Sequence, residues 1–161
     1  MPKADKRIPP RLLLNPVHLL SLGFGSGLVP LAPGTAGTLV AIPLYLLAEP
    51  LGLSAYLLLV AVMLLAGIGL CSHTSRVLGV HDHGGIVWDE IVGYFIAMIA
   101  APAGWAWVVA GFLLFRLFDI WKPWPINLLD RRVSGGTGIM LDDVVAGIYA
   151  LLVIQLAALI F

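Results

Sequence analysis

Apolar runs separated by short turns dominate the sequence and predict helices. They cover residues 38–48, 54–71, 86–101, 105–120 and 141–161. Proline and glycine lie between the first two runs, near residue 50, and between the third and fourth, near residue 103, where the chain can reverse its direction. The pattern therefore predicts an all-α bundle of about five to six helices, built from two helical hairpins and a C-terminal helix.

The length of the last run and the composition indicate an integral membrane protein. An apolar helix needs about 20 residues to cross the hydrocarbon core of a bilayer, and residues 141–161 supply them. Hydrophobic residues make up 60% of the 161 residues, against about 45–50% in soluble domains. The mean hydropathy is +1.01. Residues 38–48 are too short for a full crossing and could span only half of the bilayer.

The remaining segments complete the expected layout. Residues 1–11 form a basic arm, and residues 12–161 form a single helical membrane domain. Residues 23–38 are rich in glycine and proline, so we expect irregular backbone there, covered by protein or lining a cavity. Residues 72–83 are expected to form a polar connection, and residues 135–138 a glycine loop.

The charged residues exclude one class of partner and suggest an orientation. Nine Lys and Arg balance nine Asp and Glu, so no overall positive field would attract nucleic acid. If the chain folds at the two hairpin turns, every Lys and Arg falls at the same end of the helices. Cytoplasmic loops are enriched in these residues, so we expect this end to face the cytoplasm.

Two pairs of adjacent carboxylates are the strongest candidates for chemistry. Asp89-Glu90 and Asp142-Asp143 each stand near the start of an apolar run. One acid at a helix start can be a simple cap, but removing two charges from water costs several kcal/mol unless something pairs with them. Hard oxygen ligands favour Mg²⁺, which proteins usually bind through carboxylates and substrate phosphates. The sequence therefore predicts a Mg²⁺ site.

A third motif adds positive charge at the same end. Arg116 and Asp119 are three residues apart and so share one face of a helix, where they could form a structural ion pair or part of a site. Lys122 follows before Pro123 ends the helix. Cations beside a carboxylate cluster suit a phosphorylated substrate, so the expected chemistry is phosphoryl transfer or hydrolysis.

Four blocks of sequence carry a resemblance to a known family. The chain resembles the phosphatidylglycerophosphatase A family over nearly its whole length after residue 19. The matching blocks are residues 23–38 with their Pro33-Gly34-Thr35 core, 82–90, 115–126 and 135–143. The resemblance implies a Mg²⁺-dependent phosphatase of the bacterial inner membrane that converts phosphatidylglycerophosphate to phosphatidylglycerol and phosphate. It also implies a helical bundle with one helix surrounded by the others.

The motifs and the resemblance together suggest roles for individual residues. Mg²⁺ would be held by Asp89, Glu90, Asp142 and Asp143, and the catalytic group would be Asp89, Glu90, Asp119 and Asp143. The phosphate of the phospholipid would be bound by Arg116 and Lys122 and by the backbone of Pro33, Gly34 and Thr35. Either water or an aspartate could attack the phosphorus. The alternative function is an ion- or proton-coupled transporter that uses the same acids, which should then lie at mid-span.

Overall fold

The computed structural model describes residues 8–160, apart from the side chains of residues 130 and 131, so most of the predicted basic arm lies outside it. The described residues contain no β-strand, which confirms the prediction of an all-α fold. In chain order the elements are η1 (Pro10–Leu14), α1 (Pro16–Ser21), η2 (Gly23–Leu28), α2 (Pro33–Ala48), α3 (Leu53–Leu78), α4 (Trp88–Ala97), α5 (Trp105–Trp121), α6 (Ile126–Arg132) and α7 (Gly135–Ala158).

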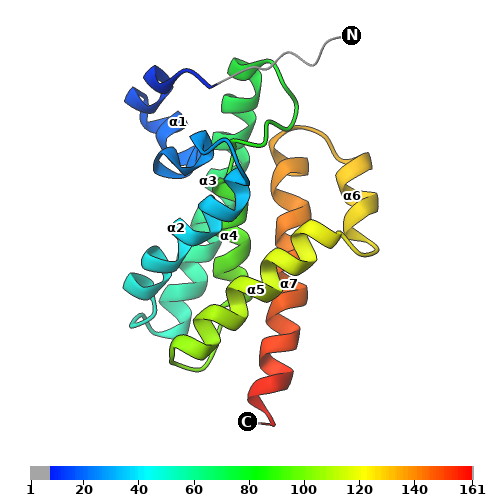
Figure 1. The fold of residues 1–161 in the computed structure, drawn as a ribbon. Coiled ribbons are helices and arrows are strands. Elements are labelled where there is room, and N and C mark those ends of the chain that lie inside the picture. Colours follow the sequence, from blue (N-terminus) through cyan, green and yellow to red (C-terminus); the bar gives the residue numbers. More distant parts are fainter. Residues whose placement is uncertain (1–7, 161) are drawn as a thin grey trace.

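Helix α4 is the centre of the bundle. Nine of its ten residues are buried, so no face of it is left for solvent or lipid. It packs against α7, α2 and α3, and it runs through the middle of the ribbon in Figure 1. Trp88 Nε1 donates a hydrogen bond of 3.0 Å to the carbonyl of Met63 in α3, which fixes its first turn. The expected arrangement of one helix surrounded by others is confirmed.

Two of the described helices are long and apolar enough to cross a membrane, namely α3 and α7. Helix α2 is also apolar but has only 16 residues. At about 1.5 Å per residue, α3 and α7 exceed the roughly 30 Å of a hydrocarbon core, whereas α2 falls short of it. The fold is therefore consistent with a membrane helical bundle in which the shorter helices complete the packing.

The two ends of the bundle differ in the way that the sequence predicts. Both hairpin turns, between α2 and α3 and between α4 and α5, lie near the C-terminus (Figure 1). The short helices α1 and α6 lie at the opposite end. The described Lys and Arg belong to η1, to the C-terminal ends of α3 and α5, and to α6. Positive charge is therefore concentrated at the end that carries α1 and α6.

Two predicted loops are instead the first turns of helices. Helix α2 begins at Pro33 rather than at residue 38, because proline suits the first helical position and Ala32 turns the chain in a left-handed conformation, with φ 52°. Helix α7 begins at Gly135, so the predicted glycine loop is wrong. A Cβ at Gly136 would collide with the carbonyl oxygen of Ile68, so this glycine allows α7 to approach α3 closely.

Two other predicted boundaries were also wrong. The polar connection begins only after Leu78, because α3 continues through residues 72–78. Two polar side chains there, Thr74 and Ser75, are buried. Thr74 donates a 2.8 Å hydrogen bond to Ser21 Oγ of α1 and accepts one from His18 Nδ1 at 2.9 Å. Helix α4 is shorter than the predicted run over 86–101 and ends at Ala97.

Candidate functional site

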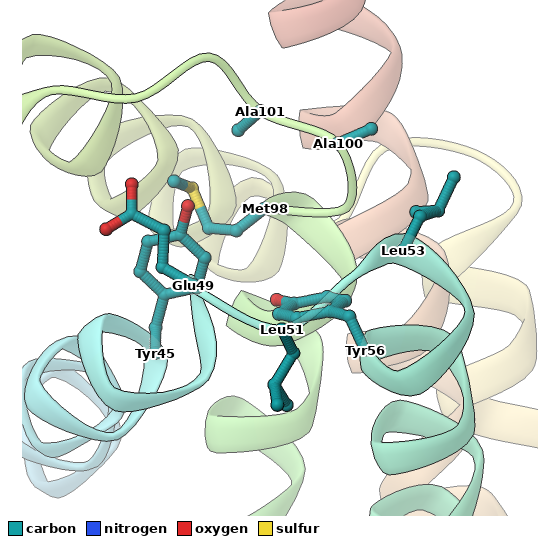
Figure 2. A pocket seen from close by; sticks show the side chains of 8 residues that line it. All are labelled: Tyr45, Glu49, Leu51, Leu53, Tyr56, Met98, Ala100 and Ala101. Carbon is teal, nitrogen blue, oxygen red and sulfur yellow. The ribbon is translucent and has the colours of Figure 1, made fainter.

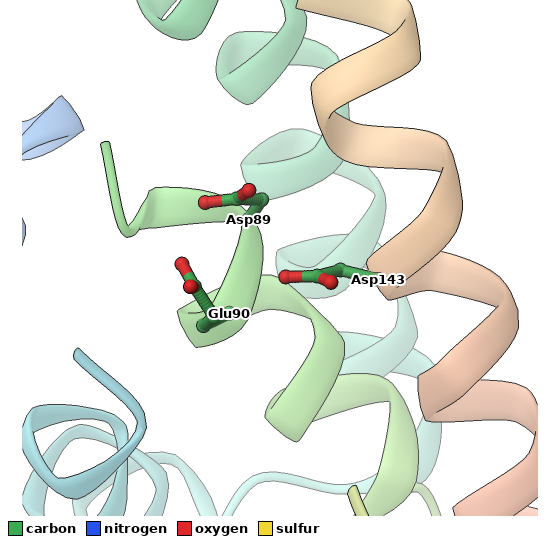
Figure 3. Close-up of side chains that lie close together, drawn as sticks. All are labelled: Asp89, Glu90 and Asp143. Atoms are coloured by element: carbon green, nitrogen blue, oxygen red, sulfur yellow. The ribbon is translucent and has the colours of Figure 1, made fainter. Parts of the chain in front are cut away.

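Three carboxylates from two helices meet at the charged end of the bundle. Asp89 and Glu90 occupy the second and third positions of α4, and Asp143 projects from α7. One oxygen of each lies within 4.8 Å of the others. Figure 3 shows Asp143 pointing from α7 toward the start of α4, where Asp89 and Glu90 lie. We call these three residues the carboxylate group. The structure thus brings together two predicted motifs that are more than 50 residues apart.

The carboxylate group is buried and incompletely hydrogen-bonded. Asp89 is 8% exposed and Asp143 is 3% exposed. Each member also has one buried oxygen without a hydrogen-bond partner, namely Asp89 Oδ1, Glu90 Oε2 and Asp143 Oδ2. Buried carboxylate oxygens are costly unless they are paired, because they have lost their hydration. Three such oxygens in one place form a donor set suited to a hard divalent cation.

Burial also changes the proton affinity of the two acids in α4. Burial raises the pKa of Glu90 to about 7, although its hydrogen bond with Asp89 and the charge of Arg116 lower it. Burial and then the charge of Glu90 raise the pKa of Asp89 well above its usual range. Carboxylates with such perturbed pKa values are concentrated at functional sites. A bound cation would favour their ionised forms by supplying the missing positive charge.

Helix α5 contributes a cation and a fourth carboxylate. Arg116 forms a short ion pair with Asp119 one turn further along the helix, and its Nη1 lies 4.0 Å from Glu90 Oε1. Asp119 also interacts with the side chain of Asp143. Arg116 Nε is buried without a hydrogen-bond partner, so the guanidinium retains binding capacity. Arg116 is therefore both the predicted ion-pair partner of Asp119 and a member of the site.

The first turn of α2 closes another side of the site. Gly34 is buried, and a Cβ at this position would collide with Glu90 Oε1 and lie 3.2 Å from both terminal nitrogens of Arg116. Pro33 and Thr35 flank Gly34 on the same turn. The predicted proximity of this segment to the acids is thus found, but it is a helix start rather than a loop. Its backbone N–H groups can interact with an anion.

Lys122 and Asp142 form a separate pair next to the carboxylate group. Lys122 Nζ lies 2.7 Å from Asp142 Oδ2. Asp142 is not part of the carboxylate group found among the described residues. Its predicted role as a metal ligand stays a prediction. Of the two predicted phosphate-binding cations, Arg116 contacts the carboxylate group and Lys122 contacts Asp142.

The glycines that allow the acids to meet were missed in the sequence. A Cβ at Gly147 of α7 would lie 2.5 Å from the carbonyl oxygen of Gly93 in α4, and a Cβ at Gly93 would collide with Phe115. Close approach of α4 and α7 at this point brings Glu90 toward Asp143. The available signal was a single glycine inside each of two apolar helices, where glycine costs about 1 kcal/mol relative to alanine and so suggests a packing role.

A cavity of about 160 Å³ lies at the other end of the bundle and is distinct from this site. Its lining includes Tyr45 and Glu49 at the end of α2 and Tyr56 near the start of α3, as Figure 2 shows. These residues lie at or next to the hairpin turn between α2 and α3, whereas two members of the carboxylate group lie in the first turn of α4, toward the opposite end of the bundle. The cavity therefore has no part in the arrangement of acids and cations described above.

Comparison with known proteins shows which family this chain resembles. A family model described as phosphatidylglycerophosphatase A matches residues 19–158. Phosphatidylglycerophosphatase A of Escherichia coli (strain K12) is 53% identical over 135 residues, which cover 83% of this chain and 78% of the relative. The protein of the same name from Haemophilus influenzae is 51% identical over 144 residues, 88% of each chain.

A third relative has a different name. A putative phosphatidylinositol-3-phosphatase of Bacteroides thetaiotaomicron is 41% identical over 150 residues, covering 86% of this chain and 91% of the relative. No solved structure is significantly similar to the chain. The family model spans all the helices that supply the carboxylate group, Arg116 and Gly34. The chain therefore belongs to the phosphatidylglycerophosphatase A family.

Proposed function

We propose that this protein is a Mg²⁺-dependent lipid phosphatase that hydrolyses the phosphomonoester of phosphatidylglycerophosphate, leaving phosphatidylglycerol and phosphate. Membership of the family supports the reaction. The structural observation that carries the proposal is the carboxylate group, which has three buried oxygens without a hydrogen-bond partner and whose Glu90 Oε1 lies 4.0 Å from Arg116 Nη1. A phosphatase of this kind needs acids for a metal ion and a cation for the phosphate, and both are present.

The residues divide into metal ligands and phosphate ligands. Asp89, Glu90 and Asp143 would hold Mg²⁺, which when bound supplies positive charge that stabilises the phosphate in the transition state. Arg116 would bind phosphate oxygens, and Asp119 would assist by holding its guanidinium in place.

The first turn of α2 would complete the phosphate site. Backbone N–H groups after Pro33, at Gly34 and Thr35, lie at the positive end of the helix dipole, which favours an anion. The close contact of Gly34 with Glu90 and Arg116 supports this role. The nucleophile is either water or an aspartate of the site. Rapid quenching would trap a phosphorylated aspartate, whereas direct attack by water would invert the configuration at phosphorus.

The proposed location is the bacterial inner membrane, with the site on the cytoplasmic side. The positions of the described Lys and Arg support this orientation, since they lie at the same end as the site. The position of the acids also supports a phosphatase over a transporter. Asp143 is the ninth residue of the 24 in α7, and Glu90 lies in the first turn of α4, so the acids lie in the half of these helices that is nearer the charged end.

Phosphate release from phosphatidylglycerophosphate by the purified protein tests the proposal. We expect activity with Mg²⁺ that chelation abolishes. Glu90→Gln and Asp143→Asn should each lower the rate by about 100-fold or more, since even residues that merely support metal ligands cost about 10–100-fold. Glu49→Gln is the matched control, because Glu49 is an exposed carboxylate at the other end of the bundle.

Two results would contradict the proposal. One is full activity in Glu90→Gln and Asp143→Asn, which would remove the carboxylate group from the mechanism. The other is a clear preference for phosphatidylinositol 3-phosphate over phosphatidylglycerophosphate, the reaction suggested by the name of the third relative.

A further inference from the structure

The pair formed by Lys122 and Asp142 has a geometry that differs from that of the metal ligands. Helix α5 ends at Trp121, and Lys122 follows in a left-handed conformation, with φ 47°. This turn directs the chain away from the helix axis. Lys122 Nζ lies 2.7 Å from Asp142 Oδ2. The side chain of Lys122 is 28% exposed, and that of Asp142 is 9% exposed. A partly exposed lysine side chain thus forms an ion pair with a nearly buried aspartate side chain.

The two neighbouring aspartates of α7 contact different residues. Successive residues of an α-helix project about 100° apart, so Asp142 and Asp143 cannot face the same neighbour equally. Asp143 joins Asp89 and Glu90 from α4. Asp142 instead contacts, through Oδ2, the residue that follows α5, and its other oxygen, Oδ1, is buried. The helix therefore separates an acid directed at the metal position from an acid directed at a cation.

We propose that Asp142 is a positioning residue, which holds Lys122 beside the carboxylate group so that its ammonium binds the phosphate of the substrate, and that Asp142 is not a metal ligand. This inference rests on the proposed function. A lysine ammonium has three N–H donors, so it can bind a carboxylate and a phosphate oxygen together. The flexible four-carbon stem of lysine otherwise allows many positions, and the ion pair with Asp142 selects one of them.

Metal binding and substrate binding separate this role from that of a ligand. Mn²⁺ serves as the probe for the metal site, and its binding to the full-length protein in detergent is measured by electron paramagnetic resonance. We expect Asp142→Asn to keep the Mn²⁺ affinity within about twofold of the parent protein. Asp143→Asn should lower this affinity by at least about tenfold, since even supporting residues have effects of this size.

Kinetics supply the second measurement. Asp142→Asn and Lys122→Met should each raise KM for phosphatidylglycerophosphate by about tenfold, the value of one charge-assisted hydrogen bond. The KM of the double variant should be no higher than that of either single variant, because the two substitutions remove the same contact. Lys122→Arg, which preserves the cation, should recover most of the loss. Asp142→Ala, which also removes the carboxylate, is the replacement variant if Asp142→Asn does not give a folded protein.

Two outcomes would overturn the inference. A loss of Mn²⁺ affinity in Asp142→Asn as large as in Asp143→Asn would make Asp142 a ligand. Multiplying effects in the double variant would show that Asp142 does not act through Lys122. If the parent protein releases no phosphate from the lipid, the proposed function fails, and the Mn²⁺ measurement still decides whether Asp142 is a ligand.

Discussion

Gly34 shows how one residue can limit the site. Gly34 has no side chain, and it lies where Glu90 Oε1 and both terminal nitrogens of Arg116 come close to α2. Any Cβ there would displace a carboxylate of the proposed metal site and a cation of the proposed phosphate site. The backbone conformation does not require glycine, since residue 34 is helical and has no positive φ. The close approach of the charged groups is therefore the reason for a glycine at this position.

We predict that Gly34→Ala lowers the rate of phosphate release by about tenfold or more, since small displacements of reacting groups have effects of up to about 100-fold. The helix itself should gain stability from alanine. Gly69→Ala in α3 is the control, because a Cβ at that exposed glycine meets nothing within 4 Å. Equal rates for the parent and both variants in a phosphate-release assay would show that Gly34 does not limit the site.

At the scale of the helices, the contact between α4 and α7 positions the acids. The two helices contact each other through Gly93 and Gly147, where backbone replaces side chains. Glu90 is three residues before Gly93, and Asp143 is four residues before Gly147, so both acids lie one helical turn from the contact. The distance between the helices at the glycines therefore sets the distance between the carboxylates.

We predict that Gly147→Ala separates α4 from α7, because its Cβ would lie 2.5 Å from the carbonyl oxygen of Gly93. Overpacking of this kind costs about 1–3 kcal/mol of unfolding free energy. The measurements are thermal unfolding followed by tryptophan fluorescence, and phosphate release. Both stability and rate should fall, in contrast to Gly69→Ala. A variant with parental stability and rate would mean that the two helices are not in contact as described.

At the scale of the whole molecule, the carboxylate group would link folding to metal binding. The acids lie between helices that are distant in sequence, and their buried oxygens lack partners in the described structure. A cation bound there would connect α4 to α7 and remove the cost of these oxygens. The metal should therefore stabilise the folded bundle in addition to serving the reaction.

We predict that Mg²⁺ at about 100 times its dissociation constant stabilises the protein by about 2.7 kcal/mol. For a chain of this size, that corresponds to a rise of roughly 5–10 °C in Tm. Chelation should reverse the rise, and Glu90→Gln should largely abolish it. Thermal unfolding in detergent is the measurement. The carboxylate group would not be a metal site if the Tm of the parent protein were the same with and without Mg²⁺.

The orientation of the molecule in the membrane is also testable. In a Cys71→Ala background, single cysteines are introduced at the exposed residues Gly84, in the connection between α3 and α4, and Ala103, in the turn between α4 and α5; these two connections lie at opposite ends of the bundle. A membrane-impermeant maleimide should label Gly84→Cys only in inverted vesicles and Ala103→Cys only in right-side-out vesicles, because the charged end is expected to face the cytoplasm. The reverse pattern would place the site on the other side. The parent Cys71 is buried and should stay unlabelled in both.

The sequence alone determined the features that depend on local order. Apolar runs of helical length predicted the all-α bundle, and the short carboxylate motifs marked Asp89, Glu90, Asp142 and Asp143 as candidate ligands, of which the structure brings three together. These inferences succeed because the length of an apolar run, the breaking of helices by proline and the cost of a charge in an apolar segment are properties of neighbouring residues.

Only the tertiary structure decided which neighbours each residue meets. Glycines at 136 and 147 resemble flexible points in the sequence, but they allow close contact with helices that are remote in the chain. Asp142 and Asp143 look equivalent in the sequence, and only the packing of α7 between α4 and the end of α5 gives them different partners. Side-chain direction is set by helix rotation and packing across the bundle, and a local pattern carries no information about the residues on the other side.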